Sequence, residues 1–170
     1  MRHPAPLIEP GICYGRLDLP LRPDADIERM ACDPLLAGSK HVWTSPSRRC
    51  RELAERIAER LGIPLSADPR LMELDFGDWE GKPWNDVPRA DLDRWAADPL
   101  GFRPPGGESG AELIARVTEF RAVLIQDCTV VSHGGPLRVL AALLRDEPVD
   151  LLEPAPAIGS IAVLTAAEIR

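Results

Sequence analysis

The stretch VVSHGGPLRVL, residues 130–140, leads from a β-branched run into a helical pattern through Ser-His-Gly-Gly. The run CTVVS at 128–132 is typical of a buried strand, and the apolar residues 135–144 predict a helix. His133, at the corner, has a side chain that titrates near neutral pH and can donate to an anion. Gly134 and Gly135 let backbone N–H groups approach an anion at a helix N-terminus. Taken alone, the corner fits an anion site and a structural turn equally well.

A second corner of the same kind lies earlier in the chain. Residues 41–45 (HVWTS) alternate like a short strand. Residues 46–61 are strongly helical, and Gly62 and Pro64 then stop the helix. The apolar residues that recur at helical spacing are Cys50, Leu53, Ala54, Ile57, Ala58 and Leu61.

Weaker patterns fill the rest of the chain. Residues 26–36 predict a weak helix disturbed by Pro34, and residues 91–97 predict a short one. Ser109 predicts the N-cap of another helix, with Glu112 as its capping-box partner. A short strand is expected from residue 64 onward, before a Gly-rich loop, and a last strand at residues 160–165.

Strands that alternate with helices predict an α/β fold, a three-layer α/β/α sandwich around a mostly parallel central sheet. The length of 170 residues suits a single domain, residues 1–170. Ligands of such sheets bind beyond the carboxyl ends of the strands. Both corners belong to that edge, so we expect their polar groups to face one site.

Composition limits the possible partners. The chain is 45% hydrophobic and 28% charged, as in ordinary globular proteins, with no apolar run of membrane-spanning length and no signal-peptide pattern. Four scattered cysteines without a C-x-x-C pair are interpreted as reduced thiols, which favours a cytoplasmic location. The net charge of −7 disfavours nucleic acid and anionic membranes as partners. An anionic ligand therefore requires a local cluster of arginines.

Arginines occur at two suitable places. Arg48, Arg49 and Arg51 fall in the first turns of the helix at 46–61, where cations oppose the helix dipole unless an anion lies between them. A solvated basic face is the alternative for each. Arg2 precedes His3, a pairing that suits a nucleophilic imidazole beside a phosphate-binding fork. The alternative for this pair is a disordered chain start.

The stretch LMELDFGDWEG, residues 71–81, gathers acidic side chains. One of them could act as a general acid among apolar neighbours, and a solvated acidic loop is the alternative. The tryptophans of this region are predicted to pack in the core or at its rim. The four acids are Glu73, Asp75, Asp78 and Glu80, and the tryptophans are Trp79, Trp84 and Trp95.

Taken in order, Arg-His at residues 2–3, TSPSRRCRELA, LMELDFGDWEG, PPGGES and VVSHGG resemble the histidine phosphatase (phosphoglycerate-mutase-like) superfamily. The combination of FGDWEG with PPGGES is most similar to the α-ribazole phosphatase branch. The resemblance covers nearly the whole chain.

The resemblance implies roles for individual residues. His3 would be the nucleophile that accepts the phosphoryl group, and Glu73 would protonate the leaving alcohol. Arg2 and Arg49 would clamp the phosphate oxygens. His133 would supply a further donor, with Gly134 beside it. The loop of Tyr14, Gly15 and Arg16 would approach the substrate.

These roles imply a metal-independent phosphomonoesterase that needs no cofactor and acts on a small-molecule phosphate monoester. The resemblance makes α-ribazole 5′-phosphate the leading substrate, ahead of sugar phosphates and phosphoserine. The alternatives are a cofactor-dependent phosphoglycerate mutase and an inactive phosphate-binding or interaction module.

The chain departs from the family pattern in two ways. Pro4 follows His3 where the family usually has glycine, which removes a backbone N–H. The family's Arg-His pair ends a central strand, and only Met1 precedes Arg2 here, so that the first central strand is expected to be truncated. Neighbouring strands could close the gap, or another chain could fill it, as in a homodimer.

Overall fold

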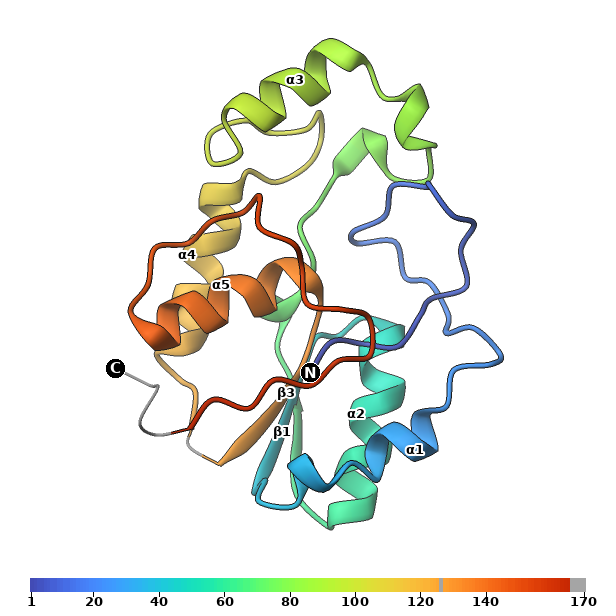
Figure 1. Cartoon of the computed structure of the whole chain (residues 1–170), viewed down its shortest axis with the longest axis vertical. Coiled ribbons are helices and arrows are strands. Elements are labelled where there is room, and N and C mark those ends of the chain that lie inside the picture. Colours follow the sequence, from blue (N-terminus) through green and yellow to red (C-terminus); the bar gives the residue numbers. More distant parts are fainter. Residues whose placement is uncertain (126, 166–170) are drawn as a thin grey trace.

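The structure, a computed structural model, describes residues 1–125 and 127–165. Helices lie on both sides of the strands, with α1 and α2 on one side and α4 and α5 on the other (Figure 1). In chain order, the elements are α1 (Ile27–Ala31), η1 (Pro34–Leu36), β1 (His41–Thr44), α2 (Arg48–Leu61), β2 (Leu65–Ala67), η2 (Pro69–Leu71), η3 (Gly77–Trp79), η4 (Trp84–Asp86), α3 (Arg89–Ala97), α4 (Gly110–Arg121), β3 (Cys128–Val131) and α5 (Gly134–Arg145).

The three strands form a parallel sheet in the order β2-β1-β3. Successive side chains of a strand point to opposite faces. Val42 and Val131 therefore join the core under α2, whereas Trp43 and Val130 pack with α4 and α5. The two cores confirm the predicted three-layer sandwich.

The helix boundaries follow local chemistry. Ser47 is the N-cap of α2, so the helix begins two residues later than expected, and Gly62 ends it in the left-handed conformation at φ 63°. Ser109 and Glu112 form the predicted capping box of α4. The weak helix expected at 26–36 is divided, because the Asp33 side chain caps a new 3-10 turn that Pro34 begins.

The tryptophans pack as predicted. The rings of Trp79, Trp84 and Trp95 contact one another and also Phe76 and Phe102. Trp79 is buried and the other two are half-buried. This cluster anchors the loops between β2 and α4 rather than offering a stacking platform.

The start of the chain is held against the end of β3. Arg2 forms a parallel bridge with Ser132, and the His3 N–H donates to the Ser132 carbonyl at 3.0 Å. The Ser132 N–H donates to the Met1 carbonyl at 3.1 Å, and the terminal Met1 nitrogen donates to the Val130 carbonyl at 2.7 Å. Residues 1–3 thus continue the sheet at its carboxyl edge and fix Arg2 and His3 there.

The strand predicted at residues 160–165 is wrong, because this segment is irregular. The Ser160 carbonyl accepts from the Arg2 N–H at 3.0 Å. A strand needs a continuous ladder of backbone hydrogen bonds to a neighbouring strand, and the sheet of the described residues consists of β1, β2 and β3.

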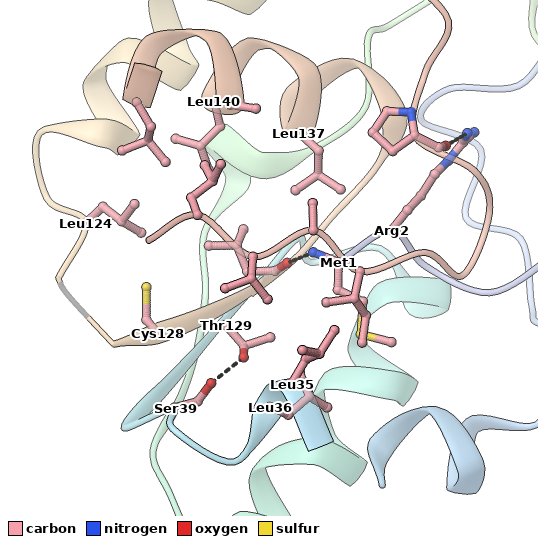
Figure 2. A pocket seen from close by; sticks show the side chains of 18 of the residues that line it. Met1, Arg2, Leu35, Leu36, Ser39, Leu124, Cys128, Thr129, Leu137 and Leu140 are labelled. Atoms are coloured by element: carbon pink, nitrogen blue, oxygen red, sulfur yellow. Dashed lines mark hydrogen bonds between the residues drawn. The ribbon is translucent and has the colours of Figure 1, made fainter. Parts of the chain in front are cut away.

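An apolar groove lies beside β3, next to Met1. It has a volume of about 450 Å³, and its walls include Leu36, Leu124, Leu137 and Leu140 (Figure 2). Among the described residues, no strand pairs with this edge of β3 beyond the Arg2 bridge. Of the predicted site residues, the groove touches only Arg2, so it is distinct from the site described below.

No helix in residues 1–125 and 127–165 is both long enough and apolar enough to cross a membrane.

Candidate active site

The two predicted corners meet at one edge of the sheet. β1 and β3 are neighbours, so the residues after β1 lie beside His133, which is the N-cap residue of α5. The His133 Nδ1 lies 3.1 Å from Arg49 Nη2, and its Nε2 lies 2.8 Å from the Ser45 hydroxyl and 3.2 Å from the Ser47 hydroxyl. His133 and Arg49 are both fully buried. The parallel pairing therefore confirms that the two corners share a site.

His3 completes this group from the start of the chain. Its ring centroid lies 5.0 Å from that of His133, edge to face. Its Nδ1 lies 2.6 Å from the Pro4 carbonyl oxygen, which only accepts, so Nδ1 carries the proton and Nε2 keeps its lone pair. Pro4 lacks an N–H but retains the carbonyl that orients the ring, so this departure from the family pattern leaves the contact intact.

Both imidazoles are neutral near pH 7. Burial lowers the pKa of His3 to about 3, against the opposing effect of the Pro4 hydrogen bond, and the charges of Arg49 and Arg2 lower it further. Burial also lowers the pKa of His133 well below 6.5, followed by the charge of Arg49. Because Arg49 can only donate, His133 Nδ1 accepts, and the remaining proton is on Nε2 facing Ser45.

Arg2 and Arg49 bring two positive charges to these neutral rings. Arg2 Nη1 donates to the Pro156 carbonyl at 2.6 Å, and Arg49 donates to the carbonyls of Gly15 at 2.6 Å and Leu17 at 2.7 Å. The Nε atoms of both arginines are buried without a hydrogen-bond partner in the described part of the chain. Buried N–H groups are rarely left unpaired, so these two are donors available to an oxyanion.

Only one of the three arginines near the start of α2 belongs to the site. Arg48 pairs with Glu52 at 2.6 Å and Arg51 pairs with Glu55 at 2.8 Å, both on the exposed face. The basic-face alternative therefore holds for Arg48 and Arg51. Arg49 differs from Arg48 and Arg51 in being buried, and burial cannot be read directly from the sequence.

Glu73 reaches the N-terminus of α5. Its Oε1 accepts from the Gly135 N–H at 3.1 Å and from the Leu74 N–H at 3.0 Å. A Cβ at Gly135 would lie only 2.4 Å from that oxygen. Gly135 thus lets the Glu73 carboxyl group lie against the helix N-terminus, whereas the sequence suggested that this N–H serves an external anion.

Gly134 faces Arg2 instead. A Cβ there would lie 2.8 Å from the Ala155 Cβ and 3.3 Å from Arg2 Cζ. The missing side chain allows the guanidinium to lie against the helix start.

The loop of residues 14–16 borders Arg49. The Arg49 Cζ lies 5.6 Å from the Tyr14 ring centroid. Arg16 is on the rim, 39% exposed, and pairs with Asp75 at 3.5 Å and Glu108 at 3.4 Å. The structure therefore places Tyr14 against the site and Arg16 at its edge.

Sequence reasoning missed several groups that touch the site. Ser45 and Ser47 flank His133, whereas the predicted site includes only an arginine from their motif, TSPSRR. Pro156 holds Arg2, and the Gly159 N–H donates to the His3 carbonyl at 3.1 Å. The serines are visible in the motif, but nothing in the sequence marks the segment around Pro156.

The described residues contain no group of three or more His, Cys, Asp or Glu side chains placed to hold a metal ion. Metal independence stays a prediction.

A parallel sheet whose carboxyl edge collects two neutral histidines, the buried Arg49, the half-buried Arg2 and a carboxyl group is built for phosphate esters. Residues 1–168 match the Histidine phosphatase superfamily (branch 1), and the chain belongs to that family. It is a phosphatase of this superfamily, as its relatives are named.

Three relatives illustrate the likeness. The adenosylcobalamin/alpha-ribazole phosphatase of Salmonella typhimurium is 30% identical over 153 residues, covering 85% of this chain and 70% of that protein. A Hydrogenobacter thermophilus protein named as a candidate phosphoserine phosphatase is 33% identical over 145 residues, covering 80% and 71%. The crystal structure of the alpha-ribazole phosphatase from Shigella flexneri superimposes with a TM-score of 0.79 at 26% identity, covering 94% and 85%.

Proposed function

We propose that the chain hydrolyses a small phosphate monoester through a phosphohistidine formed on His3. The main support for this proposal is the orientation of His3 and the groups that surround it. The Pro4 carbonyl fixes its Nδ1 proton, its lowered pKa keeps it neutral, and two arginines with free Nε groups lie beside it. A neutral, oriented imidazole next to cationic donors suits nucleophilic attack on phosphorus.

In the first step, His3 Nε2 attacks phosphorus and the bond between phosphorus and the alcohol oxygen breaks. Glu73 transfers its proton to that oxygen, and the alcohol leaves neutral. Arg2 and Arg49 bind the equatorial oxygens of the transferred group, where charge is spread in the transition state.

In the second step, the Glu73 carboxylate takes a proton from water, and the water oxygen attacks phosphorus. The bond between phosphorus and His3 breaks, inorganic phosphate is released, and both side chains regain their starting protonation states. This step requires no group beyond those of the chain and a water molecule.

His133 acts as a further donor to the transferred group. An incoming phosphate carries negative charge, which favours the protonated imidazole and opposes the effect of Arg49. Gly134 lies at the start of α5, where the helix dipole adds attraction for the phosphate.

For the substrate, α-ribazole 5′-phosphate ranks first because relatives of that name are similar over most of this chain. Phosphoserine and sugar phosphates rank next, in line with the Hydrogenobacter thermophilus relative and with a Mycobacterium tuberculosis glucosyl-3-phosphoglycerate phosphatase, 31% identical over 125 residues, covering 64% of this chain and 55% of that protein.

The test measures inorganic phosphate released from a panel of these monoesters, with and without a chelator. His3→Ala is expected to abolish turnover and the acid-labile phosphoenzyme. His41→Ala is the matched control, since His41 contacts Ser66 on the sheet and not the site. Full activity in His3→Ala refutes the mechanism, and phosphate binding without turnover favours the interaction module. Conversion of 3-phosphoglycerate to an isomer favours the mutase.

A further inference from the structure

A largely buried ion pair lies behind the loop that carries Glu73. Arg116, on α4, donates from Nε to Glu108 Oε1 at 2.7 Å and from Nη2 to Oε2 at 2.9 Å. The two side chains are only 14% and 10% exposed. Such a two-point pair has a fixed geometry and is stronger than a single contact.

The remaining donors of Arg116 hold the backbone that leads to Glu73. Nη1 donates to the Arg70 carbonyl at 2.6 Å, and Nη2 also donates to the Glu73 carbonyl at 3.1 Å. One guanidinium therefore ties both ends of residues 70–73 to α4. A lysine has a single ammonium in place of this planar fork and cannot make the same set of contacts.

Glu108 holds the residues after Glu73. Its Oε2 accepts from the Asp75 N–H at 3.4 Å, and Arg16 Nη2 lies 3.4 Å from the same oxygen. The pair thus holds the chain before and after Glu73, while the Gly135 N–H binds the carboxyl group itself. Neither Arg116 nor Glu108 contacts His3, Arg2 or Arg49 through a hydrogen bond described for this chain.

We infer that Arg116 and Glu108 are positioning residues that place the Glu73 carboxyl group for proton transfer to the leaving alcohol. The inference rests on the proposed role of Glu73 as the acid. A catalytic group has to be held within about 0.5 Å of its productive position, and backbone contacts on both sides supply that restraint.

A positioning role can be distinguished from a merely structural one by comparing two substrates, one whose leaving group needs a proton and one whose leaving group does not. 4-Nitrophenyl phosphate releases a stable phenolate that needs no proton, whereas 4-nitrobenzyl phosphate releases an alcohol that does. The two esters are similar in shape. The ratio kcat/KM reports the steps up to loss of the alcohol, so slow phosphoenzyme hydrolysis does not hide the effect.

For Arg116→Lys, we expect kcat/KM for the benzyl ester to fall about 10- to 100-fold, as for a misplaced catalytic group, and that for the phenyl ester to fall less than about threefold. Glu108→Gln is a second variant that keeps the shape of its side chain and should show the same selectivity. Arg103→Lys is the matched control. Arg103 pairs with Glu112 of α4 on the exposed surface, and both esters should react as in the unchanged protein.

The double variant Glu73→Gln/Arg116→Lys gives the decisive comparison. If Arg116 acts through Glu73, the double variant loses no more benzyl ester activity than Glu73→Gln alone. The inference is overturned if Arg116→Lys and Glu108→Gln lower kcat/KM equally for the two esters. It is also overturned if neither variant lowers kcat/KM for either ester. If Glu73→Gln itself lowers kcat/KM equally for both esters, the result refutes the proposed role of Glu73 as the acid, and the positioning inference falls with it.

Discussion

The contact between Gly135 and Glu73 predicts the effect of a single methyl group. In Gly135→Ala the new Cβ would lie 2.4 Å from Glu73 Oε1, and ordinary contact begins at about 3.4 Å. The carboxyl group therefore has to move by about 1 Å. A misplacement of this size costs about 100-fold in rate when the displaced group takes part in the reaction.

The same substitution should leave the fold nearly unchanged. Alanine is favoured over glycine in a helix by about 0.5–1 kcal/mol. Loss of the hydrogen bond from Gly135 to Glu73 costs about 1 kcal/mol and offsets that gain. We expect the free energy of unfolding to change by no more than about 1 kcal/mol, or roughly 2–4 °C in Tm.

The assay is kcat/KM for 4-nitrobenzyl phosphate, together with Tm from thermal unfolding. Gly38→Ala is the matched control, because a Cβ there meets nothing within 4 Å. A folded Gly135→Ala protein that retains kcat/KM would refute the reasoning, since the carboxylate would then not need its place at the start of α5.

Two further predictions concern the buried groups. The pKa of His3 is about 3 when folded against 6.5 when unfolded, so the unfolded chain binds the extra proton between these values. The free energy of unfolding should fall as the pH drops from 6.5 toward 3, by about 1.4 kcal/mol per pH unit from His3. The free energy of unfolding, measured by urea denaturation between pH 6 and pH 4, should fall less steeply with decreasing pH in His3→Gln than in the unchanged protein. An equally steep dependence on pH in both proteins would contradict the buried neutral state of His3. Burial raises the pKa of Cys50 and Cys13 to about 12, so in the folded protein iodoacetamide should modify exposed Cys32 first, and equal modification by mass spectrometry would contradict their burial.

The local patterns of the sequence predicted most of the layers. The apolar stripe of α2 and the Ser109 capping box are contacts within one helix, so spacing alone reveals them. The prediction of the last strand was wrong for the opposite reason, because a strand depends on contacts with another segment of the chain. Residues 160–165 have the composition of a strand, but a strand exists only through its backbone pairing with a neighbouring strand, and none of the strands in the described part of the chain lies in this segment.

For the candidate site too, the sequence predicted which residues take part and the structure showed how they are arranged. The order of motifs pointed to Arg2, His3, Arg49, Glu73 and His133, and the structure brings all five to one edge of the sheet.

What the sequence determined by itself was the kind of chemistry: the residue types, their order, and the two strand-to-helix corners. Only the tertiary structure decided which of the three arginines near the start of α2 is buried, which oxygen orients His3, and that Gly135 receives Glu73. These are contacts between residues far apart in the chain, or differences in burial between neighbours. They depend on how the layers pack, and no local pattern of residues records that.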